Sequence, residues 1–362
     1  IELLRIFAML LAAVLHILKK GGVITASEGN LAAYSTVWLL EAAAYCAVNC
    51  YALISGYVGY SDRPKPLRLA RCIELWLQVV FYSVIITTVY CIAGVGSVGV
   101  SDFADAFLPV TSKQYWYFTA YIGMFFFIPL LNALVRRLNR RALVSLCIML
   151  IAVFSLYDTF ASFWKKDPLA LVGGHSPLWL GVLYIFGAAM KKLRVPESMS
   201  SKKALLIYAS AAVFTALFKI TGDRLLRFVP GSLFVRDTSP TVLLCAAALL
   251  VAFARFKPCR KLTEFAVLFA PAAFGVYLLH VSPLVFEHVI GNRFAFIGRL
   301  PFPLIPFAVL ASAGVILVVG LAADKVRILL FKALGVPKLC RKAENSIRRL
   351  WMHVVDAAAN RE

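Results

Sequence analysis

Charged residues are scarce in this sequence. Of its 362 residues, 15% are charged and 61% are apolar, whereas a soluble globular domain has about 25% charged and roughly 45–50% apolar residues. A water-soluble fold could not bury that much apolar surface, and no stretch is long enough to form a separate soluble domain. The scarcity therefore excludes a soluble protein and indicates that much of the apolar surface faces lipid.

Paired cysteines and clusters of metal ligands are also missing. The chain has eight cysteines and five histidines, yet no two cysteines form a C-x-x-C pair and no Cys/His group has the spacing of a metal site. Most of the cysteines lie inside apolar runs, where cysteine behaves as a small hydrophobic residue. We therefore expect neither a disulfide framework nor a bound metal.

Long apolar runs dominate what is present. A membrane-spanning helix needs about 20 mostly apolar residues, and such runs recur at 2–18, 35–60, 70–94, 115–135, 142–163, 177–190, 204–220, 240–256, 264–286 and 303–323. They predict an all-α, polytopic integral membrane protein with about ten transmembrane helices in a domain of residues 1–323, followed by a tail of residues 324–362. A signal peptide is the alternative for the first run, but Arg5 interrupts this run and no A-x-A cleavage site follows it.

Basic residues predict the orientation. The net charge of +20 would suggest a nucleic-acid partner for a soluble protein. Here the basic residues gather between apolar runs, at 63–71, 136–141, 191–203 and 255–261, with less basic connections between these clusters. Because cytoplasmic loops carry the excess of Lys and Arg, we expect no nucleic acid and a cell-membrane protein with both termini in the cytoplasm.

One outer loop departs from this trend. The segment 221–239 holds Arg224, Arg227 and Arg236. Positive charge on the outer side needs another reason, so we expect these residues to help bind a substrate that is anionic or carries phosphate. The alternative is that Arg224 and Arg227 only extend to the membrane interface.

The tail has a pattern of its own. Ile347, Leu350, Trp351, Val354 and Val355 follow the spacing of one apolar helical face. Basic residues lie mostly on the other faces: Arg341, Lys342, Arg348 and Arg349. Such a helix is typical of one that lies on an anionic membrane surface, and a solvated helix packed on the inner loops is the alternative.

Ionisable residues inside a membrane are costly and mark functional sites. Arg5 and His16 both lie in the first apolar run, eleven residues apart. In an α-helix this spacing is ~1100° of rotation and ~16 Å of rise, so the two side chains point the same way but cannot touch. They form a candidate site, and the alternative is that each extends to its nearest interface.

Further polar residues fall near the level of this imidazole. Glu41 lies about two turns below the outer end of the second run, Trp116 opens the fourth, and Tyr277 and His280 lie near the outer end of the ninth. His175 occupies a short outer loop. Because histidine is the common general base near neutral pH, we expect a site here, with a carboxylate to orient the base. Membership of an aromatic belt and of an ordinary loop are the alternatives for Trp116 and His175.

The inner side offers a different chemistry. Arg68 and Arg71 follow Pro64 and Pro66 at the cytoplasmic start of the third run. The planar guanidinium fork of arginine binds phosphate, so these two residues are candidates to hold an anionic cofactor. Ordinary positive-inside charge is the alternative.

These residues carry a family resemblance. The spacing of Arg5 and His16 matches the R-x10-H signature of the first helix of the acyltransferase 3 family of membrane acyltransferases. The segment 49–57, NCYALISGY, resembles the family's FFxxSGY/F motif, 114–130 resembles its hxWF…P pattern, and 275–280, GVYLLH, resembles its GxYxxH motif. The sequence departs from the commonest pattern at Asn49 and Cys50, where Pro and a bulky apolar residue are frequent.

The resemblance implies transfer of an acyl group, usually acetyl, from acyl-coenzyme A to a hydroxyl of a surface polysaccharide, lipid-linked glycan or small molecule. His16 would be the general base or a transient acyl carrier, and Arg5 would orient the donor chain or polarise a carbonyl. Glu41 would support the site, and Arg68 and Arg71 would hold the coenzyme A phosphates. Residues expected at the acceptor are Trp116, Tyr277, His280, Arg224, Arg227 and Arg236.

Two other functions fit parts of the sequence. A transporter or flippase of polysaccharide or small molecules would also carry intramembrane charges and outward basic residues. A scaffold of an envelope complex is the third possibility, but a scaffold needs no arrangement of histidine and arginine. Membrane lipid is an expected partner in every case.

Overall fold

The computed structural model describes residues 1–225 and 229–359, with side chains to residue 353, and within these ranges it contains helices and connections but no strand. The first helices are α1 (Glu2–Lys19), α2 (Val23–Ser27), α3 (Leu31–Ala44), α4 (Ala47–Gly59), α5 (Leu69–Ala93), α6 (Val100–Phe107), α7 (Trp116–Phe125), α8 (Ile128–Arg137), α9 (Arg140–Ile151) and α10 (Asp158–Ala161). The later ones are α11 (Pro177–Lys192), α12 (Ser201–Arg224), α13 (Pro240–Arg255), α14 (Arg260–Phe269), α15 (Ala273–His280), α16 (Pro283–Val285), α17 (Ile305–Ala333) and α18 (Val336–Ala359).

Short 3₁₀ and π segments join these helices: η1 (Ala152–Tyr157), η2 (Ser162–Trp164), η3 (Val172–Gly174), η4 (Val195–Ser198), η5 (Gly231–Phe234), η6 (Ala270–Ala272), η7 (Phe286–Ile290), η8 (Ala295–Arg299) and η9 (Phe302–Leu304).

Local sequence explains where several helices begin. The side chain of Asn30 accepts hydrogen bonds from the first backbone amides of α3, and Ser176 and Asn139 do the same for α11 and α9. These caps satisfy amides that have no partner within the helix. Pro177 and Pro240 stand at the first position of α11 and α13, where the missing N–H costs nothing.

Six helical segments of the described chain are long and apolar enough to cross a membrane, and the bent pair α7 and α8 would make a seventh. The predicted number of about ten is not confirmed. Helices α11 and α13 have 16 residues each, which is about 24 Å against a hydrocarbon core of about 30 Å. Helix α1 carries the charges of Glu2, Arg5 and Lys19. The protein is all-α and multi-pass, but several of its apolar runs fold into helices too short or too polar to meet the criteria for a span.

A bend separates α7 from α8, which the sequence presents as one run. The two helices meet at 57°. Pro129, at the start of α8, has no N–H to donate and its ring would clash with the carbonyl of Phe125. The run therefore cannot continue as one straight helix.

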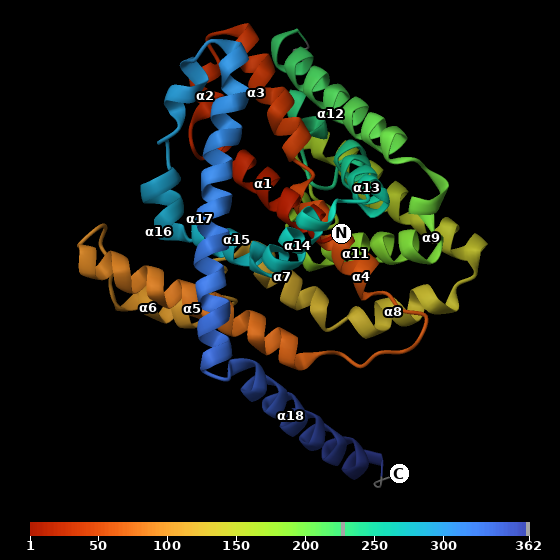
Figure 1. Cartoon of the computed structure of the whole chain (residues 1–362). Coiled ribbons are helices and arrows are strands. Elements are labelled where there is room, and N and C mark those ends of the chain that lie inside the picture. The colour runs from red at the N-terminus through yellow and green to blue at the C-terminus, as the bar shows by residue number, and fades with distance from the viewer. Residues whose placement is uncertain (226–228, 360–362) are drawn as a thin grey trace.

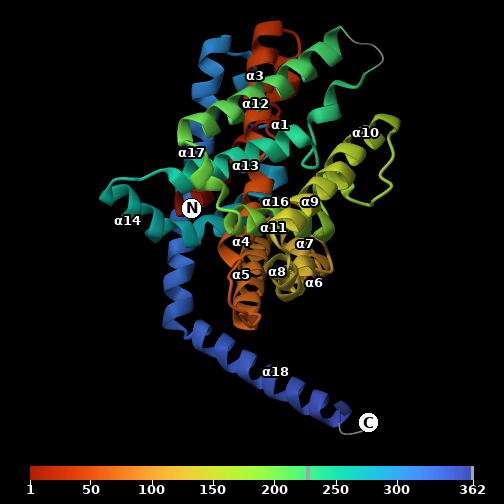
Figure 2. The same ribbon diagram turned by 90° about the vertical axis from the view of Figure 1, so that its right-hand side faces the viewer.

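Helix α1 lies near the middle of the arrangement, as Figures 1 and 2 show. It packs against α3, α4, α15 and α17. Its buried residues divide between the two main hydrophobic clusters: Leu4 and Ala8 join the larger one, with α4, α11 and α13, and Ile6 and Met9 join the one around α5 and α15. The first helix is thus fixed on several sides, and so are the polar residues that it carries.

Helices α4 and α11 pack with their backbones in contact. A Cβ on Gly56 would lie 2.0 Å from the carbonyl oxygen of Tyr184, and a Cβ on Gly187 would lie 2.1 Å from that of Leu53. Only glycine permits such an approach. This accounts for the glycine of the SGY motif on packing grounds alone.

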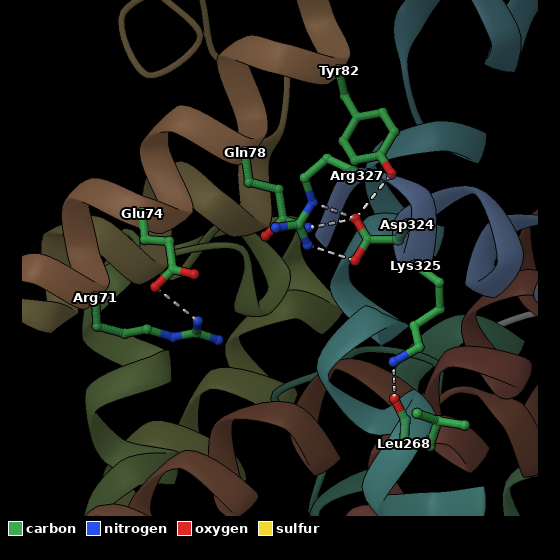
Figure 3. Close-up of polar contacts among 8 residues, drawn as sticks. All are labelled: Arg71, Glu74, Gln78, Tyr82, Leu268, Asp324, Lys325 and Arg327. Carbon is green, nitrogen blue, oxygen red and sulfur yellow. Dashed lines mark hydrogen bonds and ion pairs between the residues drawn. The ribbon is translucent and has the colours of Figure 1, made fainter. Parts of the chain in front are cut away.

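Helix α17 continues to Ala333, past the predicted domain boundary at residue 323. Its extension buries Asp324 and Arg327, which form an ion pair of 2.6 Å. Gln78 and Tyr82 of α5 donate hydrogen bonds of 3.0 and 2.9 Å to the same carboxylate, as Figure 3 shows. Helix α18 then projects away from the end of α17 (Figure 1).

Candidate functional site

Two histidines on different helices, the partly buried His16 and the buried His280, form a hydrogen-bonded chain. Nδ1 of His16 lies 2.9 Å from Nε2 of His280, and Nδ1 of His280 lies 2.6 Å from the backbone oxygen of Val276. A carbonyl only accepts, so Nδ1 of a neutral His280 carries the proton and its Nε2 accepts from Nδ1–H of His16. This assignment leaves Nε2 of His16 with a free lone pair, as a general base or nucleophile requires.

Packing fixes the orientation of the His16 ring as well. The ring stands edge-on to Phe286 of η7, with centroids 5.2 Å apart. His280 is 4% exposed, and it ends α15, which packs on α1. The imidazole of His16 is therefore held from two sides.

His16 lines a small pocket of about 60 Å³. Aromatic side chains form much of its wall: Tyr51, Trp116, Tyr117, Phe274 and Tyr277. The hydroxyl of Tyr277 is buried and has no hydrogen-bond partner among the described residues. A buried hydroxyl without a partner costs free energy, so Tyr277 is available to donate a hydrogen bond to a ligand.

A larger cavity of about 360 Å³ adjoins this pocket. Three arginines line it, Arg5 from α1 and Arg68 and Arg71 from the start of α5. Its walls share Tyr51, Tyr117 and Phe274 with the pocket of His16. The structure thus brings together the predicted arginines of two distant segments. The cavity that they line and the pocket of the predicted histidine have wall residues in common.

Neighbouring carboxylates neutralise the positive charges of the cavity arginines only in part. Arg5 is paired with Glu2 at 2.6 Å and remains 30% exposed, and Arg71 lies 3.6 Å from Glu74 and is 55% exposed. The hydroxyl of Tyr51 donates a hydrogen bond of 2.7 Å to the backbone oxygen of Arg5. An anion in the cavity would therefore meet partly exposed guanidinium groups at one end.

Glu41 makes no hydrogen bond with His16 among the described residues. Glu41 is buried, with 3% exposure, but it lines neither cavity, and its Oε2 has no hydrogen-bond partner among the described residues. The group that orients His16 is another imidazole, His280. Spacing along single helices could not predict this, because it does not show which face of α3 turns toward α1.

A second contact, between a histidine and an aspartate, was not predicted from the sequence. The ring of His175 stacks on Trp116, with centroids 3.9 Å apart and planes at 19°, and its Nε2 lies 3.2 Å from Oδ2 of Asp237. Asp237 lies in the loop before α13, and nothing in its local sequence marks it. Only the fold, which brings two connections to the start of α7, reveals this pair.

The arginines predicted for the outer loop lie in separate places. Arg236 faces the buried Asp158 at 3.7 Å, whereas Arg224 donates a hydrogen bond of 2.8 Å to the backbone oxygen of Glu28 and lies over the ring of Tyr34. Arg227 lies outside the described residues. Arg224 and Arg236 therefore do not form one cluster.

Comparison with known proteins gives one result. The family described as an acyltransferase domain, acyltransferase 3, matches residues 1–323. No curated protein and no solved structure matches the chain significantly. The match covers both cavities and confirms the resemblance seen in the motifs. The chain therefore belongs to the acyltransferase 3 family and is a multi-pass membrane acyltransferase.

Proposed function

We propose that the protein transfers an acyl group, most simply acetyl, from acyl-coenzyme A to a hydroxyl of a surface or lipid-linked glycan. The observation that carries the proposal is the pair of adjoining cavities. One end presents Arg5, Arg68 and Arg71, and the other presents His16, with common aromatic walls between them. A donor with an anionic head and a neutral reactive arm matches this arrangement in charge and shape.

The donor would enter at the arginines. Arg68 and Arg71 would bind the nucleotide phosphates, because charge-assisted hydrogen bonds to phosphate are strong and the nucleotide cannot cheaply enter a hydrocarbon region. The neutral pantetheine arm would pass Tyr51 and Tyr117 toward His16. The pocket there, of about 60 Å³, has room for only a few atoms, which favours a short acyl group.

His16 would perform the proton transfer. Its Nε2 takes the proton of the acceptor hydroxyl, the hydroxyl oxygen bonds to the thioester carbon, and the bond from carbon to sulfur breaks. The sulfur then receives the proton held by His16, so that an ester and a thiol leave. An acyl group carried briefly on Nε2 is the other possible order of the same steps.

Two neighbours would assist this step. His280 accepts from Nδ1–H of His16 and stabilises the positive charge that His16 gains. Tyr277 would donate its unpartnered hydroxyl to the oxyanion of the tetrahedral intermediate, since a donor placed in advance acts strongly at such a site. Glu41 has no role in this scheme.

The two substrates would arrive from opposite sides. We propose that the arginine cavity opens to the cytoplasm, where acyl-coenzyme A is made, and that the acceptor reaches His16 from the outer leaflet of the cell membrane. Both termini are cytoplasmic in this scheme, in agreement with the distribution of basic residues.

Purified protein in liposomes tests the proposal. Wild type should release thiol from acetyl-coenzyme A in the presence of a glycan acceptor, and His16→Ala should lose at least ~10²-fold in rate. His288→Ala is the matched control, because His288 packs beside Tyr90 and lines neither cavity. Wild-type rates in His16→Ala refute the mechanism, and movement of unmodified glycan across the membrane would instead show a flippase.

A further inference from the structure

The pair of His175 and Asp237, with Trp116, joins two connections and the start of a helix. Trp116 begins α7, His175 precedes α11, and Asp237 precedes α13. The imidazole lies flat against the indole, with centroids 3.9 Å apart, and its Nε2 bonds to the carboxylate at 3.2 Å. Aromatic stacking and an ion-supported hydrogen bond together fix the plane of the imidazole.

The carboxylate partner is held rigidly. The backbone oxygen of Asp237 accepts a hydrogen bond of 2.7 Å from Asn49, whose side-chain oxygen accepts one of 3.1 Å from Trp179. Gly174 lets Asp237 approach, because a Cβ there would lie 2.4 Å from the Cβ of Asp237. Asn49 is one of the two positions at which the sequence departs from the commonest family pattern, and here it anchors Asp237.

The imidazole of the pair is partly exposed, and its carboxylate is not. The side chain of His175 is 46% exposed, whereas that of Asp237 is 6% exposed. With Nε2–H donated to the carboxylate, Nδ1 keeps a lone pair, and among the described residues it has no partner. His175 can therefore accept a hydrogen bond from an incoming hydroxyl.

The indole ring of Trp116 lies between the exposed His175 and the pocket of His16. Trp116 lines the pocket of His16 and stacks on His175. The cavity of Arg5, by contrast, has neither Trp116 nor His175 in its walls. The pair thus lies next to a wall of the His16 pocket and is not part of the walls of the arginine cavity.

The local charges favour a neutral ligand. The cation nearest the pair in sequence, Arg236, faces the buried carboxylate of Asp158 at 3.7 Å, and His175 itself faces Asp237. Both of these positively charged or protonatable groups therefore already face a carboxylate, which disfavours recognition of an anion by either of them. A ring with several hydroxyls would find an aromatic wall and a hydrogen-bond acceptor, the usual composition of a small-molecule site.

We propose that Trp116, His175 and Asp237 form the acceptor site, which binds a neutral sugar ring and directs one of its hydroxyls toward His16. This inference rests on the proposed acyl transfer and adds the chemical class of the acceptor and its location. His175 contacts the sugar, and Asp237 acts by positioning His175.

Steady-state kinetics with octyl β-D-glucopyranoside as acceptor probe and acetyl-coenzyme A as donor test the site. His175→Phe keeps an aromatic ring on Trp116 but removes the acceptor nitrogen. We expect the KM for the glucoside to rise roughly three- to tenfold, the value of one lost hydrogen bond, with the KM for acetyl-coenzyme A unchanged. Asp237→Asn should act in the same direction, and His288→Ala should match wild type.

A binding measurement makes the test independent of turnover. The His16→Ala protein, titrated with the glucoside, should show a change in tryptophan fluorescence that is lost in His16→Ala/Trp116→Phe. An unchanged glucoside KM in His175→Phe, or a stronger effect of glucose 6-phosphate than of the glucoside as competitor, would overturn the proposal. Absence of thiol release in wild type with any acceptor would contradict the proposed function instead.

Discussion

Gly275 lies against Asp324 so closely that a Cβ on the glycine would be 2.2 Å from Oδ1 and 2.5 Å from Cβ of the aspartate. The contact joins α15 to α17. The same carboxylate accepts hydrogen bonds from Gln78 and Tyr82 and pairs with Arg327, as drawn in Figure 3. The glycine of the GxYxxH motif thus allows α15, which carries Tyr277 and His280, to pack closely on α17.

Gly275→Ala should therefore destabilise the protein and slow catalysis. The aspartate Cβ cannot swing away, so the helices must separate, and overpacking of this kind typically costs ~1–3 kcal/mol. Gly314→Ala is the matched control, because a Cβ at Gly314 meets nothing within 4 Å, and alanine favours a helix by about 1 kcal/mol over glycine. Thermal unfolding in detergent measures both. Equal melting temperatures for the two variants would contradict the role given to Gly275.

The sequence predicted the parts of the site that depend on one helix at a time. The eleven-residue spacing of Arg5 and His16 places both on one face, and the structure has one in each of two adjoining cavities. The apolar runs predicted helices because their length and composition leave no other way to satisfy the backbone in lipid.

Contacts between helices could not be predicted in this way. His280 and Glu41 are both buried ionisable residues on apolar helices, but only the packing of α15 on α1 shows that His280 is the partner of His16. The His175–Asp237 pair depends on two loops and the start of α7, whose sequences contain no common signal. Short helices such as α11 appear in the sequence as full apolar runs, so helix length in the structure does not confirm the predicted number of about ten spans.

His280 should act by orienting His16. In His280→Leu, Nδ1–H of His16 loses its acceptor, and we expect the rate constant for transfer to fall by a substantial part of the ~10²–10⁴ that a general base contributes, with donor KM unchanged. His280→Gln offers an oxygen that can accept the same hydrogen bond and should restore part of the rate. Measuring the rate constants of both variants checks this, and an unchanged melting temperature shows that the fold is intact. Equal rates for Leu and Gln would show that the hydrogen bond is unimportant.

Tyr277→Phe should remove the oxyanion donor and little else. The hydroxyl has no partner among the described residues, so its loss leaves no other group unsatisfied, and stability should not fall. A lost oxyanion donor costs about 10²–10³ in turnover. Turnover and thermal unfolding measured together separate this from damage to the fold. A variant with normal turnover would exclude Tyr277 from the transition state.

Cysteine labelling can establish the orientation. The connection between α8 and α9 should face the cytoplasm and that after η2 the exterior. Asn139 caps α9, so a cysteine at this position would remove the cap. Arg140→Cys, in a background without other cysteines, is therefore a less disruptive probe than Asn139→Cys. An impermeant maleimide applied to intact cells should miss Arg140→Cys and label Lys166→Cys, since both positions are exposed. The reverse pattern would invert the proposed topology.

The tail helix contacts the start of α5, on either side of Arg68 of the proposed donor site. Oε1 of Glu344 accepts a hydrogen bond of 3.2 Å from the backbone N–H of Leu69, which the side chain of Arg68 does not cap. Arg348 pairs with Glu344 at 2.7 Å and donates a bond of 2.6 Å to the backbone oxygen of Leu67. The tail thus supplies the missing cap at the turn that carries Arg68.

Removing this cap should weaken donor binding without affecting the acceptor. The hydrogen bond from Arg348 lowers the pKa of the Glu344 carboxyl, so the contribution of this carboxylate to docking is present above the ordinary pKa of about 4.3 and is lost as pH falls through the lowered value. At neutral pH, Glu344→Gln should act as if the group were protonated and raise the KM for acetyl-coenzyme A, because the first turn of α5 frays and Arg68 loses its position. The surface pair of Glu264 with Arg260 provides the control, since Glu264→Gln removes a similar i,i+4 pair far from α5 in sequence. If the two variants bind the donor equally well, the tail has no part in the donor site and serves only the membrane surface or the fold.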